Sequence, residues 1–235
     1  MSSAQNPSSA VVVAIDGTSG SGKSSTSRGV AARLSLRYLD TGAMYRAMTW
    51  WMLEHAVDVH DASAVAARAH EPVIVSGTDP QAPTITLDGV DVSTEIRSDL
   101  VNANVSPVSA VPEVRARMLE LQRATIQDAL DGPGIVVEGR DIGSVVWPQA
   151  QVKLYVTADP AARAARRALE EGGSDAARVQ ASLEARDRID ASRTTSPLVQ
   201  ADGAVHLDTT PYTLEEVVDQ VVALVEDAKA TARTP

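Results

Sequence analysis

Four residues, Gly17, Gly22, Lys23 and Ser24, have types and a spacing that could bind a phosphate. They satisfy the pattern G-x-x-x-x-G-K-[ST], in which main-chain amides surround a phosphate and the glycines permit the tight turn. The lysine can then reach the β- and γ-phosphates of a nucleotide, and the serine hydroxyl can bind Mg²⁺. The pattern predicts a loop that binds a nucleoside triphosphate.

The residues around this loop have the context that such a loop requires. Val11 to Asp16 form a continuous apolar run, typical of a central parallel strand. Apolar residues at helical spacing follow from Lys23 to Leu36, so the positive end of a helix would face the phosphate. A merely flexible glycine-serine turn is the alternative, and both flanking patterns disfavour it.

The class of nucleotide-binding protein depends on what accompanies the loop. A GTPase should carry the guanine-reading motif N-K-x-D, and none occurs at Asn6, Asn102 or Asn104. A D-x-x-G match at residues 131–134 is too loose to count alone. A helicase or translocase would be longer and more basic. A kinase is therefore favoured.

Several arginines stand where a second phosphate could bind. Arg46 follows a second short strand that ends at Asp40, and Arg140 follows a third strand, at the edge where open α/β sheets bind ligands. Arg186, Asp190 and Arg193 would share one helix face. An ordinary solvated salt-bridge ladder is the alternative for that face.

The remaining periodicity predicts a doubly wound α/β core with a five-stranded parallel sheet. Its strands are expected at residues 11–16, 37–40 and 135–137 and in "VKLYVTADP" and "GAVHLDTT". Helices are expected from Ala43 to His55, from Pro112 to Leu130, in two arginine-rich segments between Pro160 and Ile189, and after a capping box at Thr213 and Glu216. The segments "PVIVSG" and "PTITLDGVDVS", with a turn at Asp88-Gly89, predict a small antiparallel insert.

These elements suggest a division of the chain. The core is expected at residues 10–40, 106–157 and 196–228, one insert at 41–105, and a second at 158–195. Residues 1–9 and 229–235 are expected to be disordered.

Composition and charge limit the kinds of partner that the chain could bind. The formal net charge of -10 argues against binding a nucleic acid. The chain has no cysteine, and its four histidines lack ligand spacing, so no transition-metal site is indicated. No secretory signal precedes residue 10, and no apolar run approaches the roughly 18 residues of a membrane span. We therefore expect a soluble, cytoplasmic protein.

Five ordered motifs resemble the bacterial cytidylate kinase family: "GTSGSGKSS", "YLDTGAMYR", "TEIRSDLVNANVS", "EGRDIGSVV" and "ARDRIDASR". The resemblance covers nearly everything from Val11 to Leu224. It implies a P-loop nucleoside monophosphate kinase that transfers the γ-phosphate of ATP to CMP or dCMP with Mg²⁺. The insert at 41–105 would be the acceptor-binding subdomain, the insert at 158–195 would be a mobile lid, and the chain would be a monomer.

The resemblance also implies roles for particular residues. Ser106, Arg115 and Asp141 would read the cytosine ring, although the residues alone indicate only a turn serine before Pro107 and a surface arginine. Arg46, Arg140 and Arg193 would hold the acceptor phosphate with Tyr45 and Thr41, while Arg186 and Asp190 would meet the sugar. The expected ATP-binding residues are Gly17, Thr18, Ser19, Gly20, Ser21, Gly22, Lys23, Ser24 and Ser25. The expected catalytic residues are Lys23, Arg140, Arg163, Arg167 and Arg193, with Arg163, Arg166 and Arg167 in the lid.

Some alternatives stay open at this level. Ser24 is the expected protein ligand of Mg²⁺, and either Asp40 or Asp141 could support the ion. Glu138 and Ser24-Ser25 depart slightly from the family pattern. Within the class, the acceptor could instead be UMP or another small molecule. Outside it, the chain could be a regulatory protein that binds ATP without turnover.

Overall fold

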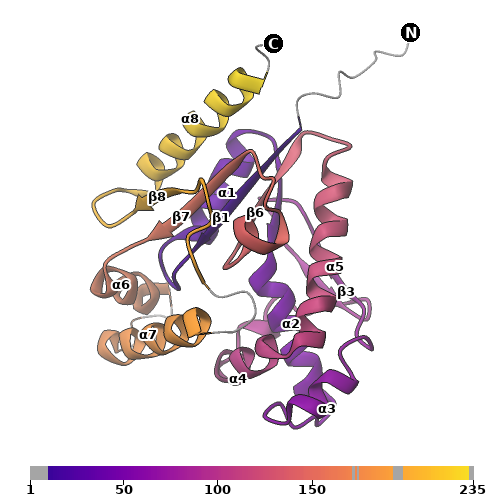
Figure 1. Ribbon diagram of the computed structural model, residues 1–235. Coiled ribbons are helices and arrows are strands. Elements are labelled where there is room, and N and C mark those ends of the chain that lie inside the picture. Colours follow the sequence, from indigo (N-terminus) through magenta and orange to yellow (C-terminus); the bar gives the residue numbers. More distant parts are fainter. Residues whose placement is uncertain (1–9, 171–172, 174, 193–197, 233–235) are drawn as a thin grey trace.

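The structure is a computed structural model that describes residues 10–170, 173, 175–192 and 198–232. Within them, five strands form one parallel sheet in the order β2-β6-β1-β7-β8 (Figure 1). The strands are β1 (Val11–Gly17), β2 (Arg37–Asp40), β6 (Gly134–Gly139), β7 (Val152–Thr157) and β8 (Val205–Asp208). The predicted five-stranded α/β core is confirmed.

The central strand β1 is buried on both of its faces. Successive residues of a strand point to opposite faces of the sheet. Val11, Val13 and Ile15 therefore join one apolar cluster, while Val12 and Ala14 join another. Each of these side chains is at most 2% exposed, which explains why the strand is a continuous apolar run.

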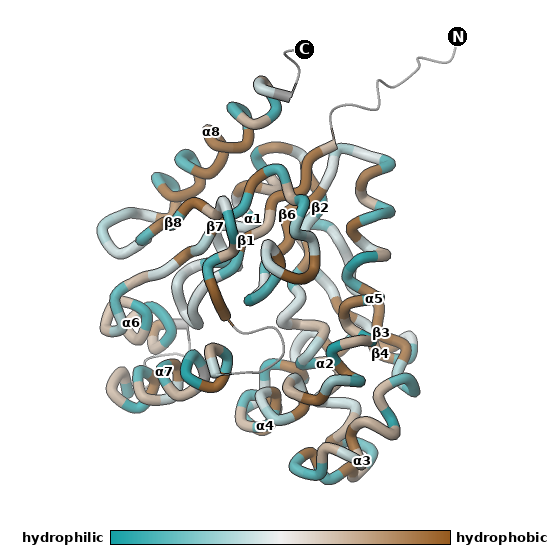
Figure 2. Tube along the Cα trace, viewed as in Figure 1, coloured by the Kyte–Doolittle hydropathy of each residue, from teal (hydrophilic) through white to brown (hydrophobic). Residues whose placement is uncertain are grey.

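Helices cover both faces of this sheet. α1 (Lys23–Arg33) and α8 (Leu214–Ala232) pack on the face of Val13, and α2 (Thr41–Glu54) and α5 (Pro112–Ala129) pack on the opposite face. Hydrophobic and hydrophilic colours alternate along α5 and α8 in Figure 2, as expected for helices with one buried side. A membrane-crossing helix is not found among the described helices, none of which has the necessary length and apolarity.

A second, antiparallel sheet follows α2. It consists of β3 (Ile74–Ser76), β4 (Ile85–Leu87) and β5 (Val90–Asp91), preceded by α3 (Ala62–Ala67) and followed by a short 3₁₀ helix, η1 (Glu95–Arg97). Asp88 and Gly89 connect β4 and β5 with φ angles of 52° and 84°. Two consecutive positive φ angles are what a tight two-residue hairpin turn requires, so the predicted turn is confirmed.

The helix α4 (Asp99–Ala110) departs from the sequence expectation. Ser98 caps it by accepting the N–H of Val101, and Pro107 lies inside it. Ser106 is therefore a helical residue rather than a turn serine before a proline. The boundary expected between residues 105 and 106 falls within α4, so the backbone is continuous there.

Two helices, α6 (Pro160–Glu170) and α7 (Ala176–Ser192), form a hairpin at the carboxyl edge of the sheet (Figure 1). The α6–α7 hairpin has an apolar core of its own, made by Ala164, Ala168, Val179 and Leu183. Each helix supplies two of these four side chains. The pair therefore packs as a unit in the region where a lid is expected.

The carboxyl-terminal expectation needs one correction. Residues 229–235 were expected to be disordered, but Lys229–Ala232 continue α8. Ala228 packs against the apolar cluster around Val221 and Val225, which ties the last turns of the helix to the core. Residues 1–9 and 233–235 lie outside the described residues.

Candidate active site

One cleft of about 1000 Å³ lies along the carboxyl edge of the parallel sheet. The loops after β1, β2 and β6 line it, together with parts of α4, α5, the small sheet and the α6–α7 hairpin. Ligands of open α/β sheets bind at this edge. The predicted site residues that line the cleft are Ser19, Gly20, Ser21, Gly22, Lys23, Ser24, Ser25, Asp40, Thr41, Tyr45, Arg46, Ser106, Arg115, Arg140, Asp141, Arg167 and Asp190.

The P-loop, residues 17–24, joins β1 to α1. A Cβ atom on Gly17 would lie 1.9 Å from the carbonyl oxygen of Val156, so only glycine lets the loop begin this close to β7. Gly22, with a φ of 87°, precedes α1, and no side chain caps the first turn of that helix. The free amides and the positive end of α1 therefore form an anion site facing the cleft.

Lys23 is buried at the floor of the cleft, with only 7% of its surface exposed. Its Nζ donates to the carbonyl oxygen of Thr18 at 2.5 Å. Burial lowers the pKa of Lys23, and the positive charge of Arg140 lowers it further. A phosphate in the cleft would favour the charged ammonium and give it a stronger acceptor than a neutral carbonyl.

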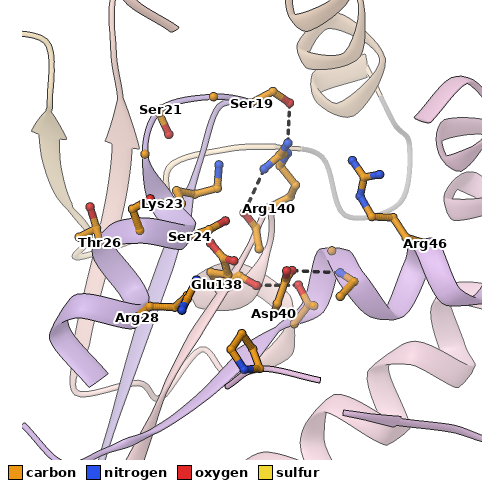
Figure 3. A pocket seen from close by; sticks show the side chains of 18 of the residues that line it. Ser19, Ser21, Lys23, Ser24, Thr26, Arg28, Asp40, Arg46, Glu138 and Arg140 are labelled. Carbon is orange, nitrogen blue, oxygen red and sulfur yellow. Dashed lines mark hydrogen bonds between the residues drawn. The ribbon is translucent and has the colours of Figure 1, made fainter. Parts of the chain in front are cut away.

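Arg140 follows β6 and reaches toward the P-loop (Figure 3). Its Nη2 donates to Ser19 Oγ at 2.6 Å, and its Nε donates to Asp190 Oδ2 at 2.9 Å. The Asp190 side chain, on α7, is only 7% exposed. The guanidinium is thus fixed between the P-loop and the α6–α7 hairpin, beside one of the residues predicted to share its site.

A buried ion pair forms another wall of the cleft. Arg115 Nη2 donates to Asp141 Oδ2 at 2.5 Å, and both side chains are 9% exposed. The Arg115 guanidinium also lies 5.7 Å from the ring centroid of Tyr45. Ser106 lines the same cleft from α4. Arg115 is therefore no surface arginine, and the three residues predicted to read the base meet in one cleft.

Arg46 and Thr41 reach the cleft from α2. Arg46 Nη1 donates to the carbonyl of Ile96 at 3.1 Å and to Asn102 Oδ1 at 2.6 Å. Thr41 Oγ1 donates to the carbonyl of Glu138 at 2.7 Å. Figure 3 places Arg46 across the cleft from Lys23, with Arg140 between them. Two guanidinium groups and an ammonium therefore face one hollow.

Oxygen donors suited to Mg²⁺ gather beside Lys23. Ser24, Asp40 and Glu138 all line the cleft and lie close together in Figure 3. Glu138 Oε1 accepts the Tyr38 hydroxyl at 2.6 Å, its Oε2 is buried, and the Ser24 side chain also interacts with this carboxylate. Burial and the charge of Asp40 raise the pKa of Glu138. Mg²⁺ prefers one or two carboxylates together with phosphates, so these residues fit the ion. Asp141 is engaged by Arg115, which favours Asp40.

Asp16 is a buried carboxylate that the sequence analysis missed. Its two oxygens accept the N–H groups of Ile142 and Gly143, both at 2.8 Å, and it is 2% exposed. These amides begin the π-helical turn η2 (Ile142–Val146), directly after Arg140 and Asp141. Asp16 therefore fixes the turn that presents both residues. Its place at the end of an apolar strand, next to the glycine motif, was the available signal.

Three arginines that were predicted to be site residues are not seen to line the cleft. Arg163 does not line the cleft: it is buried, and its Nη1 donates to the carbonyl of Ser19 at 2.9 Å and to Asp187 Oδ2 at 2.5 Å. Arg193 lies outside the described residues. Arg186 lies on α7, and its side chain is also outside the description. Asp187, which binds the P-loop, was missed because it lies within a run of charged residues on a helix.

One end of the cleft is apolar and belongs to the P-loop side. Leu169, Tyr212 and Leu214 line it and are 81%, 42% and 52% exposed. Arg166 closes the same end and donates to Thr209 Oγ1 at 3.0 Å and to the Thr209 carbonyl at 2.9 Å. Large exposed apolar side chains around a cleft indicate a site for a flat apolar group.

The sheet, the P-loop and the guanidinium groups opposite it define the class of P-loop nucleotide kinases. A family model for cytidylate kinase matches residues 13–227. The cytidylate kinase of Streptomyces avermitilis is 57% identical over 221 residues, covering 94% of this chain and 95% of the relative. The cytidylate kinase of Nocardia farcinica is 49% identical over 225 residues, covering 94% and 96%. The chain belongs to the cytidylate kinase family.

A comparison of folds found a solved structure with a similar architecture. A crystal structure of an uncharacterized protein from Eubacterium ventriosum has a TM-score of 0.52 with this chain and covers 92% of it and 98% of the other chain. The two sequences are only 9% identical, so this likeness concerns the fold alone.

Proposed function

We propose that this chain transfers the γ-phosphoryl group of ATP to CMP or dCMP, giving ADP and CDP or dCDP, with Mg²⁺ as cofactor. The observation that carries the proposal is a single cleft in which Lys23 and the P-loop face Arg46 and Arg140. The similarity to cytidylate kinases over nearly the whole chain supports the same reaction.

The donor nucleotide is assigned to the P-loop side. Amides at the start of α1 suit the β-phosphate, and the ammonium of Lys23 suits the β- and γ-phosphates. The apolar end formed by Leu169, Tyr212 and Leu214 suits the flat base of ATP.

The acceptor nucleotide is assigned to the opposite side. Arg46 and Arg140 suit its phosphate, with Thr41 and Tyr45 beside them. Cytosine carries an amino donor and two acceptors, which a carboxylate, a guanidinium and a hydroxyl can satisfy. Asp141, Arg115 and Ser106 supply those three groups. Asp190 and Arg186 are assigned to the sugar, and Arg193 to the phosphate, by resemblance.

The reaction needs charge compensation more than base catalysis. A phosphate monoester has a second pKa of about 6, so the attacking oxygen of CMP is already ionised at neutral pH. Lys23 and Arg140 neutralise charge on the moving phosphoryl group, and Arg46 holds the nucleophile in place. Mg²⁺, held by Ser24 and Asp40, would add positive charge on the phosphates. The residue range 158–195 would act as a lid that excludes water, with Arg163, Arg166 and Arg167 on it.

A panel of acceptors tests the proposal. The chain is incubated with ATP and Mg²⁺ and with CMP, dCMP, UMP or AMP, and ADP release is followed. We expect ADP with CMP and dCMP only, and at least about 100-fold less with Lys23→Ala, since it removes a positive charge from the transition state. Lys229→Ala, on α8 outside the cleft, is the matched control. Turnover with UMP would mean that the acceptor is not restricted to cytidine nucleotides. If none of the four acceptors gave turnover, the chain would instead be a regulatory protein that binds ATP.

Two further expectations belong to the same proposal. A monomer fits a cleft built by one chain, and size-exclusion chromatography with light scattering measures the mass directly. A cytoplasmic location fits a kinase that consumes ATP, and fractionation of the source cells tests it.

A further inference from the structure

The α6–α7 hairpin holds the P-loop at one residue, Ser19. Asp187 Oδ1, on α7, accepts the N–H of Ser19 at 2.9 Å. Arg163 Nη1, on α6, donates to the carbonyl oxygen of Ser19 at 2.9 Å and to Asp187 Oδ2 at 2.5 Å. The Arg163 and Asp187 side chains are 7% and 14% exposed. The two side chains and the main chain of Ser19 thus form a closed, buried ring of hydrogen bonds.

Packing at the next residue strengthens this attachment. A Cβ atom on Gly20 would lie 3.2 Å from Leu183 Cδ1 and 3.3 Å from Arg163 Cβ. Leu183 belongs to the apolar core between α6 and α7. The P-loop therefore packs directly on the hairpin, and its shape at residues 19 and 20 depends on where the hairpin lies.

The Ser19 side chain extends the ring to the acceptor side of the cleft. Ser19 Oγ accepts Nη2 of Arg140 at 2.6 Å, and Arg140 Nε donates to Asp190 Oδ2 at 2.9 Å. Asp187 and Asp190 lie three residues apart on α7, so they are neighbours on its surface. One helix therefore fixes both the P-loop and an arginine assigned to the acceptor phosphate.

We propose that Asp187 is a positioning residue that couples the donor and acceptor phosphate sites through Ser19. It does not line the cleft, so it acts through the groups that it holds. When α7 is docked, Asp187 orients the Ser19 main chain, and Ser19 Oγ is then placed to orient Arg140. This inference rests on the proposed function, because it assigns the two ends of the cleft to donor and acceptor.

A purely structural role for Asp187 makes a different prediction. If the residue only stabilised the hairpin, its loss would lower the melting temperature, and the effect would add to that of a change at Ser19. If it acts through Ser19, the two effects must be non-additive, because residues in one hydrogen-bond network share their energy. A double-mutant cycle on activity therefore separates the two roles.

The cycle uses Asp187→Ala, Ser19→Ala and the double variant, with kcat and KM for both substrates. We expect kcat to fall on the order of 10- to 100-fold in Asp187→Ala, in line with misplaced catalytic groups, and the double variant to be no worse. Asp187→Asn keeps an oxygen for the Ser19 N–H and should recover part of the rate. Glu184→Ala, one turn earlier on α7 and bonded to Gln180, is the control and should keep the wild-type rate. Additive losses, or a rate in Asp187→Ala within 2-fold of wild type, would overturn the proposal.

A binding measurement covers the case in which the wild-type chain shows no turnover, which would contradict the proposed function instead. Calorimetric titration gives the affinity for a non-hydrolysable ATP analogue with and without CMP. We expect CMP to tighten binding of the analogue in the wild type and in Asp187→Asn, and to lose this effect in Asp187→Ala. Equal coupling in all three chains would overturn the role of Asp187 whatever the turnover.

Discussion

At the scale of single residues, the site depends on buried charges whose partners come from distant parts of the chain. Asp16 on β1 holds the turn after β6, and Asp141 in that turn pairs with Arg115 on α5. A charge removed from water costs several kcal/mol unless such partners compensate it. The same contacts that keep these charges buried also set the positions of the groups that face the cleft.

Asp16 should leave a signature in the pH dependence of stability. Burial raises its pKa from 3.8 to about 6, against the opposing effect of its two backbone hydrogen bonds. Because the folded state then holds the proton more tightly, this contribution to stability is complete below pH 4 and is lost as pH rises through about 6. A pKa rise of this size corresponds to about 3 kcal/mol.

The measurement is urea denaturation of the wild type and Asp16→Asn between pH 4.5 and 7. The free energy of unfolding of the wild type should fall relative to that of the variant as pH rises across this range. Asp227→Asn, on the exposed side of α8, should show no such trend. A constant difference between wild type and Asp16→Asn would mean that Asp16 has an ordinary pKa in the folded protein.

At the scale of elements, Asp40 has two roles, and two substitutions at this position can separate them. It ends β2 and caps α2, where Oδ1 accepts the N–H of Ala43 at 3.0 Å, and it is also a proposed support for Mg²⁺. Asp40→Ala should cost about 1 kcal/mol of stability through the lost cap, whereas Asp40→Asn should cost little because asparagine caps as well.

Both variants at Asp40 should need more Mg²⁺ for half-maximal phosphoryl transfer, because both lose the carboxylate. The measurements are thermal unfolding and a magnesium titration of the rate. Asp99→Asn, in the first turn of α4, serves as a matched control that also removes a carboxylate near a helix start. If Asp40→Asn showed the magnesium dependence of the wild type, Asp40 would cap α2 but would not support Mg²⁺.

The elements also show which parts of the fold the sequence could predict. Strands of the central sheet are continuous apolar runs because both faces are buried, and such runs are visible in one sequence. The helix α4 is not visible, since serine, asparagine and an internal proline all favour breaks, and its stability comes from burying Val101, Val105 and Val108. The P-loop follows from its own motif. The role of Asp187 cannot be predicted in this way, because nothing in the sequence near a carboxylate on a charged helix face indicates its distant partner.

At the scale of the whole molecule, the cleft is lined from several separate parts of the chain. The P-loop side includes the α6–α7 hairpin, and the opposite side includes α2 and the small sheet. We expect closure to accompany phosphoryl transfer, because water in an open cleft would compete with CMP for the γ-phosphate. We therefore expect the small sheet and the hairpin to approach each other when both nucleotides bind.

Spin labels can measure this approach directly, because the chain has no native cysteine to compete. One label is placed at Arg178 on α7 and one at Gln81 between β3 and β4, both exposed positions. The distance should shorten by several ångströms with a non-hydrolysable ATP analogue and CMP together. Labels at Asp131 and Asp227 should keep their distance. An unchanged first pair in an active enzyme would mean that transfer proceeds without closure.

The continuity of α4 limits how the acceptor preference of this enzyme could be redesigned. A chimera that exchanges residues 41–105 with those of another kinase would cut a helix one residue before Ser106 and separate that serine from its own turn. Moving the second exchange point to Val111, where α4 ends, would transplant the helix intact together with the rest of the insert. Protein engineers working on nucleotide analogues should therefore treat α4 as part of the module that is swapped.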